Sequence, residues 1–134
     1  MPWRLSLDKI PFQPLRIPPG WRIDWNTLFE VDPSEESARA GFFGGSSLFA
    51  ASNEDLRLCI DLEWRPEDDP AGEYLLSVMY VPWERTENGR RRKGLGLNFG
   101  NARLVYSFRT RARIELVREL EAVLMGRPEW IEHN

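Results

Sequence analysis

The strongest constraint on the fold is a strict alternation of apolar and polar residues over positions 55–64. A period of two is typical of a β-strand that packs one face on a core and turns the other to solvent. A turn-rich acidic segment at 66–72 follows, and then an apolar run at 74–83. We therefore predict an antiparallel hairpin around an acidic turn, and we expect strand 74–83, apolar on both faces, to be a central strand covered on both sides. The alternating apolar residues are Leu56, Leu58, Ile60, Leu62 and Trp64.

Weaker local signals predict the remaining elements. Proline removes a backbone donor and fixes φ, so the five prolines of residues 1–20 indicate an extended segment, whose apolar residues place it on the core. Thr110 is a predicted N-cap, and Gly126 fits the end of the helix that follows it. The other predicted elements are strands at 21–25, 47–50, 94–100 and 103–109 and a short helix at 34–40 that ends at Gly41.

These elements predict an α+β fold, a twisted and mainly antiparallel sheet with a C-terminal helix packed on one face. The chain has 134 residues, which is the usual size of one domain and enough for one hydrophobic core. We therefore expect a single domain over residues 1–134. Of the tryptophans, we expect those on or beside predicted strands to be in the core and those near the chain ends to be exposed. The first group is Trp21, Trp25, Trp64 and Trp83, and the second is Trp3 and Trp130.

The composition argues against most enzyme chemistry. The chain has one cysteine, Cys59, and one histidine, His133, which lies next to the C-terminal residue. A zinc site built from Cys and His needs about four such ligands, or three plus a water, and nucleophilic mechanisms of the Ser–His or Cys–His kind need a histidine held by a packed scaffold. We therefore expect a binding protein rather than an enzyme, with no cofactor and no metal. No apolar run approaches the ~20 residues of a membrane span, and the start lacks a signal-peptide pattern, so the expected location is the cytoplasm.

Charges are unevenly distributed along the chain. Residues 30–73 hold twelve acids and three bases, whereas residues 85–113 hold nine bases and one acid. Two interpretations stay open: an acidic face and a basic face, or two halves that neutralise each other in the fold. A solvated surface with local ion pairs explains the pattern as well as a recognition surface does.

Four groups of residues are candidates for chemistry. The acidic run Glu67–Asp69 with Glu73 resembles calcium ligands in type, but its spacing differs from the EF-hand loop, so we interpret it as a solvated turn or as an acidic lip for a basic partner. The basic run 90–93, Arg-Arg-Arg-Lys, is a candidate nucleic-acid contact, although the sequence pI of about 5.3 counts against it. Asp61 and Glu63 share a strand face, as a catalytic carboxylate pair requires, but exposed strands often carry such pairs. Cys59 lies beside these carboxylates, which raise a thiol pKa, so we interpret it as an inert cysteine under the helix.

Two segments resemble a known group of proteins. The first runs from Ile17-Pro18-Pro19-Gly20-Trp21 through Trp25-Asn26 and Phe29 to Val31-Asp32-Pro33, and the second runs from Leu62 to Tyr74 around the acidic turn. Both are similar to segments of immunity proteins of bacterial polymorphic toxin and contact-dependent inhibition systems. The resemblance implies a protein that binds its cognate toxin domain and blocks it without catalysis.

We therefore expect an immunity protein that neutralises a toxin domain by stoichiometric binding, as a monomer or weak dimer, without membrane or nucleic-acid partners. An acidic surface suits a toxin with a basic substrate groove, such as a nuclease, and complementary charge speeds encounter. The alternative is a small RNA-binding or regulatory module that uses residues 90–93. Our hypothesis for the toxin-facing residues is that their carboxylates imitate phosphates. These residues are Glu35, Glu36, Glu67, Asp68 and Asp69.

Overall fold

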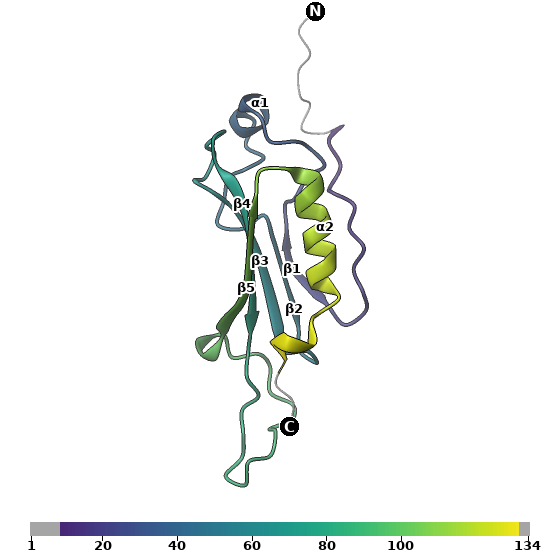
Figure 1. Ribbon diagram of the computed structural model, residues 1–134, viewed down its shortest axis with the longest axis vertical. Coiled ribbons are helices and arrows are strands. Elements are labelled where there is room, and N and C mark those ends of the chain that lie inside the picture. The colour runs from purple at the N-terminus through teal and green to yellow at the C-terminus, as the bar shows by residue number, and fades with distance from the viewer. Residues whose placement is uncertain (1–8, 132–134) are drawn as a thin grey trace, which may run out of the picture.

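A computed structural model describes residues 9–131 of the chain and shows a five-stranded antiparallel sheet in the order β1-β2-β3-β4-β5 (Figure 1). Every strand pairs with its sequence neighbour, so the sheet is a simple meander. A C-terminal helix packs on the sheet, which confirms the predicted α+β class. The elements are β1 (Arg22–Asn26), α1 (Glu35–Arg39), β2 (Phe49–Asn53), β3 (Leu58–Arg65), β4 (Glu73–Tyr80), η2 (Phe99–Asn101), β5 (Arg103–Thr110), α2 (Arg113–Leu124) and η3 (Pro128–Trp130).

The predicted hairpin is the centre of the sheet. β3 and β4 pair without a break from Leu58 opposite Tyr80 to Arg65 opposite Glu73. The side chains of Leu58, Ile60, Leu62 and Trp64 are buried, because the two-residue period sends all of them to the same face. The alternation therefore predicted this strand and its buried face correctly. Leu56 precedes the strand and lies in the turn between β2 and β3.

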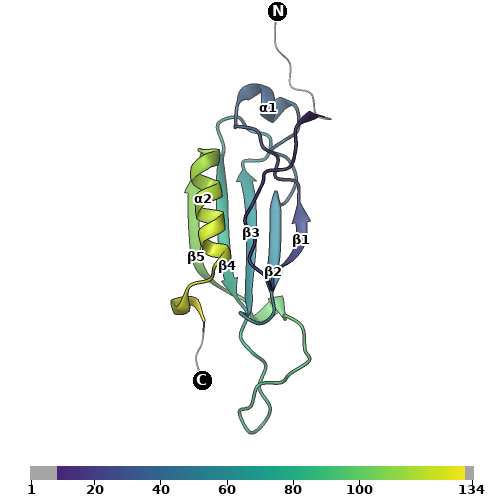
Figure 2. The same ribbon diagram turned by 90° about the vertical axis from the view of Figure 1, so that its right-hand side faces the viewer.

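One face of the sheet is covered by two segments that lie side by side. α2 packs over β4 and β5, and the proline-rich residues 9–20 run beside it over the other strands (Figures 1 and 2). Glu121 of α2 accepts a hydrogen bond from the backbone N–H of Arg16 at 2.7 Å, and the indole N–H of Trp21 donates to the carbonyl oxygen of Leu124 at 2.8 Å. The expectation that the N-terminal segment lies on the core is confirmed for residues 9–20.

The opposite face, which we call the open face, carries Cys59, Asp61, Glu63 and Arg65 of β3 and Leu75, Ser77 and Met79 of β4. These side chains are half-buried, whereas those on the helix side are buried. The expectation that strand 74–83 is covered on both sides is wrong, because β4 ends at Tyr80 and only its helix-facing residues are enclosed. The placement of Cys59 under the helix is wrong for the same reason, since the register puts it on the open face.

Two predictions for the C-terminal half of the chain are also wrong. Residues 94–100 form no strand, because Asn98 caps the short helix η2 by accepting the N–H of Gly100 at 3.1 Å. Ala112, not Thr110, is the N-cap of α2, and the Thr110 hydroxyl oxygen instead accepts the N–H of Ala112 at 3.1 Å. The helix stops before Gly126, whose φ of 74° lies in the left-handed region that glycine tolerates, as predicted.

The tryptophans depart from expectation at two positions. Trp25 is 54% exposed, and Trp130 is 4% exposed. The pairing of β1 with β2 shifts register between Ile23 and Trp25, so the apparent alternation of this edge strand does not give it one buried face. Trp130 is enclosed because its ring packs on Tyr106, with centroids 5.4 Å apart. Trp64 is buried as predicted, Trp21 and Trp83 are half-buried, and Trp3 lies outside the described residues.

Candidate protein-binding surface

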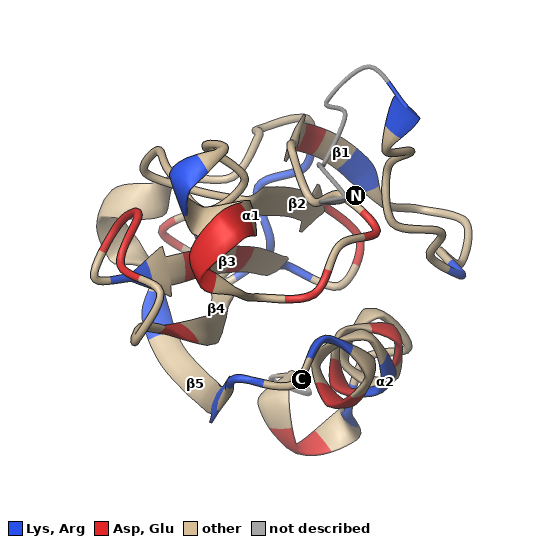
Figure 3. Ribbon diagram, turned by 90° about the horizontal axis from the view of Figure 1, so that it is seen from above, with Lys and Arg blue, Asp and Glu red and all other residues tan. Residues whose placement is uncertain are grey.

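The five carboxylates proposed as partner-binding residues come together at one end of the sheet, which we call the acidic end. α1 carries Glu35 and Glu36, and the turn between β3 and β4 carries Glu67, Asp68 and Asp69. Figure 3 looks onto this end and shows the acidic residues of α1 and of that turn on the same side of the molecule. Four of the side chains are exposed, and Asp69 is half-buried. The fold therefore joins two acidic segments that are well separated in the sequence.

Phe43 holds the two segments together. Its carbonyl oxygen accepts the backbone N–H of Asp68 at 2.9 Å, and its ring packs on Trp64 with centroids 4.6 Å apart. The next residue has little room, because a Cβ added to Gly44 would lie 2.8 Å from a carboxylate oxygen of Asp68. The loop after α1 is thus fixed against the β3–β4 turn, and the acidic end is a preformed surface.

α1 is short, but its start is held firmly. The hydroxyl oxygen of Ser34 accepts the N–H of Ser37 at 3.0 Å, and the Ser34 N–H donates to the Ser37 hydroxyl at 2.8 Å. This reciprocal pair is a capping box, which satisfies two backbone donors that a helix start otherwise leaves free. Ser37 also donates to the carbonyl oxygen of Asp32 at 2.8 Å. The cap therefore fixes the start of α1, and with it the backbone positions from which Glu35 and Glu36 extend into solvent.

Both interpretations of the charge pattern hold in part. Arg113 pairs with Asp32 at 2.8 Å, and Arg109 pairs with Glu73 at 3.5 Å, so part of the basic second half neutralises part of the acidic first half. The acidic end is partly compensated by Arg39, which pairs with Glu35. The exposed pairs of Arg39 with Glu35 and of Arg109 with Glu73 are each worth about 0–1 kcal/mol and are screened by salt, so an incoming cation competes with them easily.

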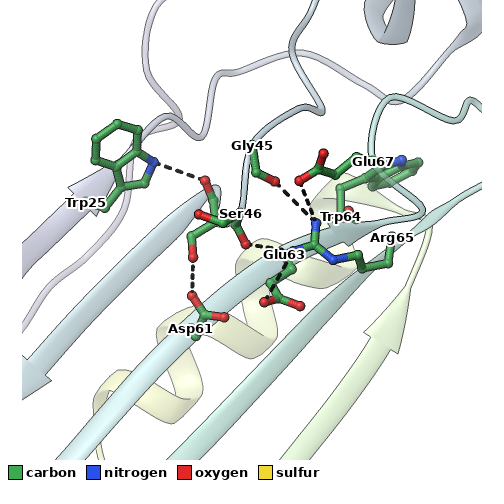
Figure 4. Close-up of polar contacts among 9 residues, drawn as sticks. Trp25, Gly45, Ser46, Asp61, Glu63, Trp64, Arg65 and Glu67 are labelled. Atoms are coloured by element: carbon green, nitrogen blue, oxygen red, sulfur yellow. Dashed lines mark hydrogen bonds and ion pairs between the residues drawn. The ribbon is translucent and has the colours of Figure 1, made fainter. Parts of the chain in front are cut away.

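The open face continues from the acidic end along β3 (Figure 4). Arg65 links the two regions, because its guanidinium donates to the carbonyl oxygens of Gly45 at 3.2 Å and Ser46 at 2.9 Å. The same guanidinium lies 3.5 Å from Glu63 and 3.6 Å from Glu67. These bonds attach the loop of residues 44–47 to the open face of the sheet, which faces the viewer in Figure 4.

Asp61 and Glu63 lie on the open face, as the alternation predicts. Asp61 accepts a hydrogen bond from the hydroxyl of Ser47 at 2.6 Å. Burial raises the pKa of Glu63 above its usual value, and the hydrogen bond and negative charge of Asp61 raise it further. The two carboxylates therefore form a site where an additional positive charge would be favourable.

Trp25 is the surface residue that sequence reasoning missed. Its indole N–H points back to the protein, 3.0 Å from the carbonyl oxygen of Ser47 and 3.2 Å from the hydroxyl of Thr27. A hollow of about 400 Å³ lies beside it, lined by Trp25, Thr27 and residues 44–47. An exposed aromatic ring in a fixed orientation is typical of interface anchors. No sequence pattern indicates this exposure, because the register shift in β1 is invisible in the alternation of residues 21–25.

The basic run 90–93 lies on the long loop between β4 and β5, at the end of the molecule opposite α1 (Figures 1 and 2). Its four side chains are exposed. The guanidinium of Arg91 lies 5.1 Å from the ring centroid of Trp83, and Arg92 lies 3.7 Å from Glu84. The structure therefore does not bring this run together with the acidic end.

The part of the chain that the structure describes, residues 9–131, contains no cluster of three or more His, Cys, Asp and Glu side chains arranged to hold a metal ion. It also contains no helix long and apolar enough to cross a bilayer.

Comparison of the chain with models of known protein families, with curated proteins and with solved structures found no match.

Proposed function

We propose that the chain is an immunity protein that binds and neutralises a cognate bacterial toxin domain in the cytoplasm by stoichiometric contact. The acidic end carries this proposal, because the fold gathers carboxylates from α1 and from the β3–β4 turn into one exposed, preformed surface. The resemblance of the segments around Trp21 and Trp64 to immunity proteins supports the same function. A toxin with a basic substrate groove, such as a nuclease, is the partner that such a surface fits.

Charge complementarity gives this surface a kinetic advantage. Attraction between opposite charges raises association rate constants from roughly 10⁵–10⁶ M⁻¹s⁻¹ toward 10⁸–10⁹ M⁻¹s⁻¹ at low salt. An inhibitor that must reach a toxin before the toxin reaches its substrate benefits directly from this rate. The same attraction predicts that association slows as the salt concentration rises.

Preorganisation supports tight binding as well. The acidic end is held by the backbone hydrogen bond between Asp68 and Phe43 and by the capping box of α1. Ordering a flexible interface side chain costs about 0.5–1.5 kcal/mol, and a loop costs more. A surface that is already ordered avoids much of that cost.

The test uses the product of the reading frame directly upstream of this chain. Co-expression should rescue cells from that product, and the two proteins should co-elute with one-to-one stoichiometry. A variant with five amides, E35Q/E36Q/E67Q/D68N/D69N, should associate at least tenfold more slowly at low salt and should lose most of its salt dependence. The matched control also removes five exposed carboxylates, but outside the acidic end: E54Q/D55N/E87Q/E115Q/E129Q.

The outcomes separate the alternatives. Equal association rates for the two variants would show that the acidic end is not the contact. Failure of the wild-type chain both to rescue and to co-elute would contradict the immunity function itself. Binding of single-stranded RNA with a steep salt dependence, lost when residues 90–93 are changed to glutamine, would instead support the RNA-binding alternative.

A further inference from the structure

The open face contains a hollow of about 490 Å³ that the acidic end does not include. It lies over the middle strands, and Ala50, Cys59 and Met79 line its floor, with Phe99 from η2 at its side. α2 and residues 9–20 lie on the other side of the sheet (Figures 1 and 2). Within residues 9–131, no helix or strand closes over this hollow.

The lining is apolar where a solvent-facing sheet is usually polar. Phe99, in the lining, is 58% exposed. Leu104 lies outside the lining, but it pairs with Met79 across β4 and β5 and is also 58% exposed. Cys59 adds to the apolar character, because burial raises the pKa of its thiol to about 11 and keeps it uncharged. Contiguous exposed apolar surface of this kind marks contact sites in soluble proteins.

The rim of the hollow is negatively charged. Asp24 and Asp61 both line it, and Arg22 is the cation in the lining. Arg22 is already engaged, with its Nε 2.7 Å from a carboxylate oxygen of Asp24. Asp61 lies beside Glu63, and the hydrogen bond that Asp61 accepts from Ser47 comes from an uncharged hydroxyl. The rim therefore favours an occupant that brings its own positive charge.

The hollow is also continuous with the acidic end. Asp61 lines the hollow, Glu63 lies between Asp61 and Arg65 on the same face of β3, and Arg65 contacts Glu67 of the acidic end (Figure 4). A single protein partner that is attracted to the acidic end by its basic residues can therefore reach the hollow along one strand. A second copy of this chain would bring two negative rims together.

We propose that the hollow on the open face receives an apolar side chain of the toxin domain, with a neighbouring lysine or arginine of the toxin paired to Asp61 and Glu63. This inference rests on the proposed immunity function and adds a second, apolar contact to the acidic one. The acidic end accelerates encounter, and the open face slows dissociation, because buried apolar contacts chiefly determine how long a complex lasts.

Cys59 reports directly on the hollow, because it is the only cysteine of the chain. Its alkylation by a small maleimide is followed by intact-mass spectrometry, for the chain alone and for the purified complex with the upstream gene product. We expect at least tenfold slower alkylation in the complex. Unchanged alkylation in a complex that still forms and still rescues would overturn the inference and leave the immunity function standing.

Matched variants test the energetic role. F99A/L104A removes two exposed apolar side chains from the open face, and I114A/M125A removes two that are also exposed, one from α2 and one from its C-cap residue. F99A/L104A should dissociate from the toxin at least tenfold faster than the wild type, and I114A/M125A should dissociate at the wild-type rate. Both variants should keep the wild-type melting temperature. Equal dissociation rates would overturn the inference.

Two other outcomes would also contradict the inference. If alkylation of the chain alone slows as its concentration rises, a second copy covers the face and the inference is wrong. If the upstream gene product neither binds nor is neutralised, the proposed function fails, and the inference fails with it.

Discussion

The guanidinium of Arg57 lies over the indole ring of Trp83, with its carbon 4.4 Å from the ring centroid. Arg57 is buried, and its Nε donates to the carbonyl oxygen of Val81 at 3.1 Å. A second guanidinium nitrogen donates to the carbonyl oxygen of Pro82 at 3.4 Å. One side chain from the β2–β3 turn thus fixes the chain where β4 has ended and the loop that carries the basic run begins.

Replacing Arg57 with methionine should destabilise the protein by about 2–4 kcal/mol, because two carbonyl oxygens lose a charged donor and the stacked cation is lost. For a chain of this size, that corresponds to a fall in melting temperature of roughly 6–15 °C. Arg57→Lys should recover only part of the loss, since an ammonium cannot reproduce the planar fork.

The control for this prediction is Arg118→Met, which changes an exposed arginine on α2 in the same way. It should leave the melting temperature within about 2 °C of the wild type, as surface substitutions usually do. Equal effects of the two substitutions would show that the contact with Trp83 contributes nothing.

Gly72 should not tolerate alanine. A Cβ at this position would lie 2.6 Å from the indole nitrogen of Trp64 and 2.8 Å from the carbonyl oxygen of Arg65. The indole cannot move away freely, because it donates to the carbonyl oxygen of Asp69 at 2.8 Å. We expect a loss of about 1–3 kcal/mol, the usual cost of overpacking, measured by urea unfolding. Gly96→Ala has room for its Cβ and should be close to neutral, and similar losses at both sites would contradict this explanation.

The sheet was predictable where one residue period governs both burial and pairing. The alternation at 55–64 determined which face of β3 is buried, and the acidic turn determined its partner strand. The alternation at 21–25 looked similar but failed, because β1 is an edge strand with a register shift between Ile23 and Trp25. An edge strand has one neighbour, so its pairing is constrained less than that of β3. Sequence alternation alone does not distinguish these two cases.

The candidate site was predictable in composition but not in arrangement. Counting charges identified the acids of α1 and of the β3–β4 turn, yet their juxtaposition depends on the contact of Phe43 with Asp68 and Trp64. The double-sided apolar character of the run 74–83 suggested a covered strand. The structure leaves Leu75 and Met79 on the open face, so the same apolar residues now mark a surface that lacks a cover within the described chain.

The thiol of Cys59 should react slowly. Burial raises its pKa from 9.0 to about 11, and the negative charge of Asp24 contributes to the shift. Since the thiolate is the reactive form, the rate of alkylation at about pH 8 should be roughly a hundredfold lower in the folded protein than in the same chain unfolded in urea. Asp24→Asn should raise the folded-state rate slightly. Equal rates for the folded and unfolded chains would show that the thiol is neither buried nor perturbed.

Glu63 should make the protein less stable as the pH rises. Burial raises its pKa above the ordinary value of 4.5, Asp61 raises it further, and Arg65 offsets only part of the shift. A raised folded-state pKa means that the folded protein favours the protonated carboxyl. The stability that this group contributes is therefore complete below its unfolded pKa and is lost as the pH rises through its folded pKa.

Glu63→Gln keeps the shape of the side chain and removes its charge. By urea unfolding, the variant should be more stable than the wild type at about pH 7, and the two should converge at about pH 4, where the wild-type carboxyl is largely protonated. Glu67→Gln is the matched control, because Glu67 is exposed and contacts the same guanidinium of Arg65. Glu67→Gln loses the ion pair with Arg65, and it removes no buried charge because Glu67 is exposed. It should therefore gain no stability at about pH 7. A wild-type advantage over Glu63→Gln at about pH 7 would mean that the pairing of Glu63 with Arg65 outweighs its burial and its repulsion by Asp61.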